Sequence, residues 1–64
     1  MRKKVEFMID GLTVKLIEGK DAFGCEVINL YVNGRYKGFY DVFRIEDVEQ
    51  ELKYDLNFLD EAYC

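Results

Sequence analysis

The sequence predicts one α+β domain: a four-stranded antiparallel sheet of two β-hairpins, with a C-terminal amphipathic helix packed on one face (ββββα). Two observations carry this prediction. Asp10-Gly11 and Asn33-Gly34 each separate two stretches of alternating apolar residues, which is the strongest short-range signal for a hairpin. Apolar residues then recur at helical spacing over 45–63. The 64 residues make a single domain, 1–64, near the lower size limit for folding on a hydrophobic core.

The first hairpin is predicted over residues 3–9 and 12–18. A two-residue type I′ turn pairs the residues as Ile9·Leu12, Phe7·Val14 and Val5·Leu16, which places six apolar side chains on one face. A slip of one residue would lose this agreement. The loop "GKDAFG" (19–24) that follows lacks the Gly-Lys-Ser/Thr ending of a phosphate-binding loop, so we interpret it as an ordinary connection.

The second hairpin is predicted over residues 25–32 and 35–40. A two-residue turn gives the pairs Val32·Arg35, Tyr31·Tyr36, Leu30·Lys37, Asn29·Gly38, Ile28·Phe39 and Val27·Tyr40. In this register the Ile, Leu, Val and Phe side chains face the core. The outer face then carries a secondary candidate surface of three tyrosines: Tyr31, Tyr36 and Tyr40.

The helix is predicted to begin at Asp41, or one turn later, and to continue to the end of the chain. One stripe of apolar residues is expected to face the sheet: Ile45, Val48, Leu52, Leu56, Leu59 and Tyr63. Glu49 and Lys53 are expected to form an i,i+4 ion pair.

A second stripe lies roughly opposite the first, with five residues at i, i+4, i+7, i+11 and i+14: Asp47, Glu51, Tyr54, Phe58 and Glu61. Two aromatic rings inside a rim of carboxylates are typical of a protein-recognition surface, so we predict partner binding here. An alternative remains open, in which the helix ends before Phe58 and that ring returns to the core.

Charge is divided unevenly along the chain. Residues 1–40 carry seven basic and five acidic side chains (+2), whereas residues 41–64 carry two and eight (−6), giving the net −4. An acidic surface repels nucleic acid and attracts basic protein surfaces. A solvated helix face would show the same charge, and charge alone favours that simpler interpretation.

The tyrosines, with Met8 and Ile17 beside them, admit two further interpretations. Tyrosines near lysines can stack on single-stranded nucleic acid. Basic residues are few, however, the net charge is negative, and no aromatic signature of the "GFGF" kind occurs. We therefore expect no direct nucleic-acid binding, and expect the tyrosines to shield the sheet or to pack against a second copy.

Catalysis is not expected. The chain has no His and no Ser, which removes the usual nucleophile–base pairs, and zinc would need two ligands beyond Cys25 and Cys64. We predict no cofactor and no metal, with Cys25 as a buried thiol inside a strand. No apolar run could cross a membrane, and "MRKKVEFMID" lacks the apolar region of a signal peptide, so we expect a cytoplasmic protein.

In size, acidity and compact β-plus-helix build, the chain resembles the small phage-encoded inhibitors of bacterial defence and host enzymes, such as anti-CRISPR proteins and the phage inhibitors of uracil-DNA glycosylase. The resemblance is one of class and includes no specific motif. It implies an inhibitor in a bacterial host cell whose acidic helix occupies a basic nucleic-acid groove, with carboxylates in place of phosphates. The other function class is a homodimeric structural or accessory module that pairs through its tyrosine face or a sheet edge.

Overall fold

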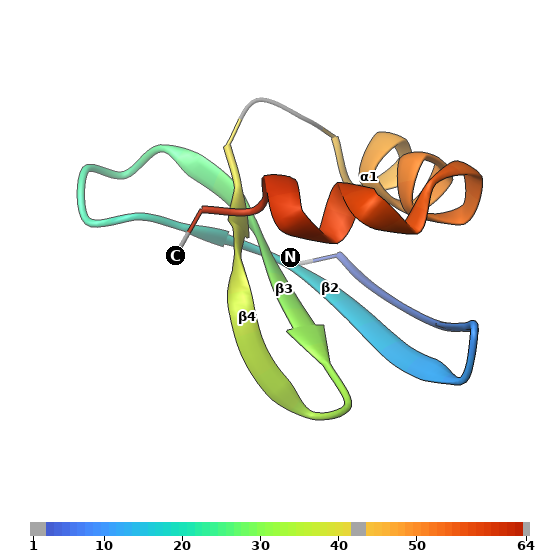
Figure 1. Ribbon diagram of the computed structural model, residues 1–64. Helices are drawn as coiled ribbons and strands as arrows, with labels where there is room; N and C mark the ends of the chain where they lie inside the picture. The colour runs from blue at the N-terminus through green and yellow to red at the C-terminus, as the bar shows by residue number, and fades with distance from the viewer. Residues whose placement is uncertain (1–2, 42–43, 64) are drawn as a thin grey trace.

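The computed structural model describes residues 3–41 and 44–63. Its elements are β1 (Lys4–Ile9), β2 (Leu12–Lys20), β3 (Glu26–Val32), β4 (Arg35–Tyr40), α1 (Ile45–Tyr54) and the 3₁₀ helix η1 (Leu56–Glu61). The strands form one antiparallel sheet in the order β1-β2-β3-β4. Both helices lie on the same face of this sheet (Figure 1). The predicted α+β class with a four-stranded antiparallel sheet is therefore confirmed.

The first hairpin has the register that alternation predicts. Ile9 pairs with Leu12, Phe7 with Val14 and Val5 with Leu16. Asp10 and Gly11 have φ values of 50° and 78°, the positive values that a type I′ turn requires at both central positions. The odd-numbered residues of β1 consequently face the core together with Val14 and Leu16 of β2.

The second hairpin contains a β-bulge that the alternating pattern does not predict. Pairing begins as expected at Val32·Arg35 and Tyr31·Tyr36, and then shifts by one residue to Leu30↔Gly38, Asn29↔Phe39 and Ile28↔Tyr40. The extra residue is Lys37, and the four predicted pairs beyond Tyr31·Tyr36 are wrong. Since side chains alternate between the faces, one inserted residue sends Tyr40 to the core and Phe39 to the outer face.

The core lies between the sheet and the helices. It is built from buried residues of β2, β3, β4 and α1: Val14, Leu16, Ile28, Leu30, Tyr40, Ile45, Val48 and Leu52. Its largest side chain is Tyr40, which is 1% exposed. The Tyr40 hydroxyl donates a hydrogen bond to the backbone oxygen of Phe58 at 2.8 Å, and the two rings stack at 4.9 Å. Tyr40 therefore fixes η1 against the sheet.

The helical segment is interrupted at Asp55, so the predicted continuous helix to the end of the chain is wrong. Asp55 is extended (φ −145°, ψ 108°), and its side chain accepts a hydrogen bond from the Asn57 backbone N at 3.0 Å. An aspartate that binds the backbone two residues ahead competes with helical hydrogen bonding. At the other end, α1 begins at Ile45 after Arg44, which is the later of the two expected starts.

The residues after η1 return to the edge of β4. Phe39 and Tyr63 exchange two backbone hydrogen bonds of 2.8 Å each. A Cβ atom at Gly38 would lie 2.3 Å from the backbone oxygen of Tyr63, so this approach requires glycine. Tyr63 is 58% exposed and does not face the core, contrary to its place in the predicted apolar stripe.

Candidate protein-interaction surfaces

The outer face of α1 presents three of the five predicted partner-binding residues together. Ile45, Val48 and Leu52 are buried, and this fixes the rotation of the helix on the sheet. Asp47, Glu51 and Tyr54 are consequently exposed, and Tyr54 is 89% exposed. We call these three residues the α1 outer face. They form a compact surface in which one aromatic ring stands beside two carboxylates.

Phe58 does not belong to this surface, and its predicted position beside Tyr54 on one continuous helix is wrong. The break at Asp55 rotates the chain, and the Phe58 ring is partly buried against the core, stacked on Tyr40. The alternative interpretation, in which the helix ends before Phe58, is the one that the structure bears out. Glu61 is exposed, but it lies at the end of η1, beyond the break.

Negative charge is concentrated in the helical layer. Residues 44–63 carry two basic and seven acidic side chains (−5), whereas residues 3–41 carry six of each (0). The predicted pair between the Lys53 ammonium and the Glu49 carboxylate is present at 2.8 Å. The ammonium of Lys53 also lies 5.0 Å from the centre of the Phe7 ring. The charge of Lys53 is therefore partly neutralised by Glu49, and the acidic side chains outnumber the basic ones in this layer.

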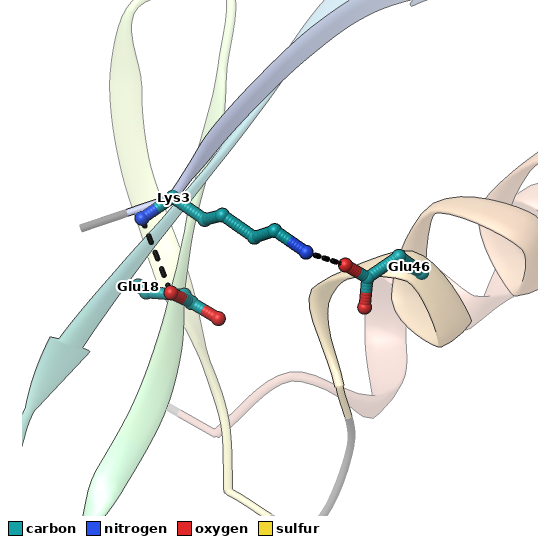
Figure 2. Close-up of polar contacts among 3 residues, drawn as sticks. All are labelled: Lys3, Glu18 and Glu46. Carbon is teal, nitrogen blue, oxygen red and sulfur yellow. Dashed lines mark hydrogen bonds and ion pairs between the residues drawn. The ribbon is translucent and has the colours of Figure 1, made fainter. Parts of the chain in front are cut away.

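An open cleft of about 890 Å³ lies between β2, β3 and the start of α1. Its lining includes three basic and four acidic side chains: Lys3, Lys20, Arg44, Glu18, Glu26, Glu46 and Asp47. Figure 2 shows that Lys3 reaches from the start of the sheet to α1, where its ammonium pairs with the Glu46 carboxylate. The backbone N of Lys3 donates to Glu18 Oε1 at 3.1 Å.

The Lys3–Glu46 contact defines the electrostatics of the cleft. Its hydrogen bond raises the pKa of the Lys3 ammonium and lowers the pKa of the Glu46 carboxyl, so both groups stay charged at neutral pH. Because acids and bases nearly balance in the lining, the cleft does not select an anion or a cation by charge. Among residues 3–41 and 44–63, no group of three or more Cys, Asp or Glu side chains is placed to hold a metal ion.

The outer sheet face carries the second candidate surface. The register aligns two neighbouring rows of side chains across the strands: Glu6, Lys15, Tyr31 and Tyr36 in one, and Lys4, Ile17, Asn29, Phe39 and Tyr63 in the other. Tyr31 and Tyr36 meet edge to face with ring centres 5.5 Å apart, and Phe39 lies 5.7 Å from Tyr63. We call these four aromatic residues the sheet aromatics.

Only two of the three predicted tyrosines lie on this surface. Tyr40 was predicted on the outer face, and the bulge instead places it in the core. Phe39 and Tyr63 were not predicted there. One signal for the bulge was present in the sequence, because a glycine inside a strand pattern, here Gly38, is typical of a bulge or of a close backbone approach.

Cys25 is also placed differently from its prediction. It is exposed in the connection between β2 and β3, and not buried within a strand. Asp21 shapes this connection, since its Oδ1 accepts hydrogen bonds from the backbone N of Phe23 at 2.8 Å and of Cys25 at 2.9 Å. The connection projects beyond the body of the sheet (Figure 1), and Phe23 is 90% exposed there. Cys64 lies outside the described residues.

We found no protein family, curated protein or solved structure that matches this chain. Within the described residues, neither helix has the length and apolar character needed to cross a bilayer. Two surfaces of the molecule are candidates for a function, the α1 outer face and the sheet aromatics.

Proposed function

We propose that the protein is a non-catalytic inhibitor that binds a basic surface of another protein through the α1 outer face. The observation that carries the proposal is the joint exposure of Asp47, Glu51 and Tyr54 on α1, outside the row of residues that the helix buries against the sheet. A tyrosine that is 89% exposed offers a large ring that a partner can bury at little conformational cost.

The charge of the helical layer indicates what kind of partner fits. Seven acidic side chains over residues 44–63 attract a surface rich in Lys and Arg and accelerate encounter with it. Residues four apart on a helix lie about 6 Å from each other along its axis, near the spacing of successive phosphates. A basic groove that normally holds nucleic acid would accept such a row of carboxylates. Nucleic acid would then be excluded from the groove, which is the mode of inhibition that the resemblance to phage inhibitors implies.

The non-catalytic part of the proposal rests on composition and exposure. The sequence has no His and no Ser. The carboxylates of the α1 outer face are exposed to water and are not enclosed in a site that could bury a substrate. We propose neither a cofactor nor a metal for this surface, and place the protein in the cytoplasm of a bacterial cell.

The test is a comparison of two double variants with the native protein as baits in a bacterial lysate. Tyr54→Ala/Glu51→Lys changes the α1 outer face. Tyr36→Ala/Glu26→Lys makes the same chemical changes at exposed positions on the sheet and is the matched control. We expect a partner that the native protein and the control retain and that the first variant binds at least about tenfold more weakly.

Two further readouts decide whether the bound partner fits the proposal. Retention should fall as salt rises, because exposed charges attract each other less at high ionic strength. Single-stranded or duplex nucleic acid should compete for the partner. A partner that survives Tyr54→Ala/Glu51→Lys unchanged, or that is indifferent to salt, would contradict the role of the α1 outer face.

A second candidate function is a homodimeric module that pairs through its outer sheet face. It is favoured by the sheet aromatics, of which Tyr36 and Tyr63 are more than half exposed, and by Met8, which is 72% exposed on β1. Here the roles of the two variants reverse. Tyr36→Ala/Glu26→Lys would lower the mass in solution from dimer to monomer, and Tyr54→Ala/Glu51→Lys would leave it unchanged.

A further inference from the structure

The two edges of the sheet differ in whether their backbone groups are paired. At β4, Phe39 exchanges hydrogen bonds with Tyr63, and the bulge at Lys37 further disturbs the edge. At β1 no such cover exists among the described residues. An uncovered strand edge is a template for another strand, and native proteins normally protect it. The exposed edge of β1 therefore calls for an explanation.

Hairpin geometry identifies which groups of β1 are unpaired. In an antiparallel pair, alternate residues exchange hydrogen bonds with the neighbouring strand. Ile9 flanks the two-residue turn, and the backbone N of Glu18 donates to the oxygen of Lys3 at 3.0 Å, so the odd-numbered residues bond to β2. Lys4, Glu6 and Met8 thus direct their backbone N–H and C=O groups away from the sheet, and all three residues are exposed.

We propose that this edge binds the same edge of a second copy of the chain, antiparallel and centred on Val5, with Lys4 of each copy opposite Glu6 of the other. The two sheets would join into one continuous sheet of eight strands. The interface is independent of the α1 outer face, so it stands or fails separately from the proposed inhibition.

Charge selects this register over its neighbours. Lys4, Glu6 and Met8 of one copy must pair with the same set of residues in the other copy. Each possible register is therefore defined by the residue that lies on the two-fold axis, and neighbouring registers differ by one residue at that position. Centring on Glu6 places two Glu6 carboxylates opposite each other, which is destabilising. Centring on Phe7 places Glu6 opposite Met8, and Lys4 opposite Asp10, which lies in the turn with φ 50°. Only the register centred on Val5 gives two opposite-charge pairs between strand residues.

The other edge explains why assembly would stop at two copies. Pairing of β1 with β1 uses the same strand of both chains, and a two-fold interface of this kind closes on itself. Further growth would need the edge of β4, which Tyr63 already occupies at Phe39. The expected product is a dimer and not a filament.

A charge exchange tests the proposal in solution. Sedimentation of the native protein at rising concentration should show a reversible dimer. Glu6→Lys should weaken it about tenfold, because the two-fold axis makes one substitution disturb two pairs. Lys4→Glu should act alike, and Lys4→Glu/Glu6→Lys should restore the native affinity. Glu26→Lys, an exposed charge reversal away from this edge, is the control.

Amide hydrogen exchange supplies a second, independent readout on the folded native protein. The amide protons of Lys4 and Glu6 should become protected as concentration rises, whereas those of β4 should not change. A Glu6→Pro variant, which removes an outward N–H and no bond to β2, should be monomeric. A native protein that stays monomeric, a dimer that the charge exchange fails to restore, or protection confined to β4 would each overturn the proposal.

Discussion

The two hairpins begin with the same kind of turn and end differently. Asp10-Gly11 and Asn33-Gly34 both place their residues at positive φ, and each hairpin starts in the register that a two-residue turn imposes. The first hairpin keeps that register to its end. The second gains one residue at Lys37, and the face of every later side chain is reversed. A turn therefore fixes only the pairs next to it, and packing decides the rest.

The largest effect should come from deleting one residue in each hairpin. Deletion of Met8 would shift the register of β1 and turn Val5 and Phe7 away from the core, at a cost of more than about 3 kcal/mol. Deletion of Lys37 removes the bulge and preserves the observed pairs Leu30↔Gly38 and Ile28↔Tyr40, so the fold should survive. Urea unfolding compares the two variants, and equal losses of stability would show that the bulge itself is essential.

The next prediction concerns Phe39 and Tyr40 of β4, which the bulge places on the outer face and in the core respectively. Tyr40→Ala empties a site that is 1% exposed and should destabilise the protein by about 3–5 kcal/mol. Phe39→Ala, on the outer face, should cost distinctly less. Thermal unfolding of both variants measures the difference. The uninterrupted register predicts the opposite ranking, so a larger loss for Phe39→Ala would refute the bulge.

The third comparison uses two strand glycines. A methyl group at Gly38 would meet the Tyr63 backbone oxygen at 2.3 Å, whereas at Gly19 it would meet the side-chain nitrogen of Asn29 at 2.8 Å. A side chain can turn aside more readily than a backbone. We expect Gly38→Ala to cost about 2–4 kcal/mol and Gly19→Ala about 1 kcal/mol or less. In Gly38→Ala, loss of amide protection at Phe39 and Tyr63 would identify the displaced segment.

The smallest effect concerns the Tyr40 hydroxyl and alkaline pH. Burial raises its pKa from 10.0 to about 12, and the carboxylates of Asp60 and Glu61 add to this effect. The folded state thus favours the neutral hydroxyl. The contribution of the neutral hydroxyl to the free energy of unfolding is complete below pH 10 and is lost as pH rises towards 12. We expect the free energy of unfolding to fall by about 1–2 kcal/mol. This is less than the pKa shift alone would give, because water screens the two carboxylates.

Tyr40→Phe is the control for this titration. This variant should be less stable than the native protein by about 1 kcal/mol at neutral pH, because it lacks the hydrogen bond to the Phe58 oxygen. The difference in unfolding free energy between native protein and variant should then fall above pH 10, and reach zero or change sign by pH 12. A difference that stays constant to pH 12 would show that Tyr40 ionises as easily in the folded protein as in the unfolded chain.

Local pattern was sufficient for the parts of the fold that depend on neighbouring residues. The Asn/Asp-Gly turns, the register of the first hairpin and the Glu49–Lys53 pair are all short-range features, and the sequence predicts them. The break at Asp55 could not be read from periodicity, since Leu56 and Leu59 continue the apolar spacing beyond it. A single side chain that accepts a hydrogen bond from Asn57 outweighs that pattern.

The candidate surfaces divide in the same way. Asp47, Glu51 and Tyr54 share one uninterrupted helix and were predicted correctly as a set of exposed residues. Phe58 and Tyr40 were misplaced because each lies beyond an irregularity, and the two rings stack on each other. Phe39 and Tyr63 were missed because their contact joins residues far apart in the sequence. The periodicity of helices and strands does not indicate that the segment after η1 returns to the edge of β4.

The bridge between Phe39 and Tyr63 also bears on how the protein is made. Both hairpins can form as soon as their residues leave the ribosome, because their pairs are close in sequence. The β4 edge must wait until residue 63 has emerged. During that interval the nascent chain exposes both sheet edges, and it is then most prone to pair with other unfinished chains. Protection of β4 thus follows the synthesis of both hairpins and of α1, and a chain truncated before Tyr63 would keep this edge exposed.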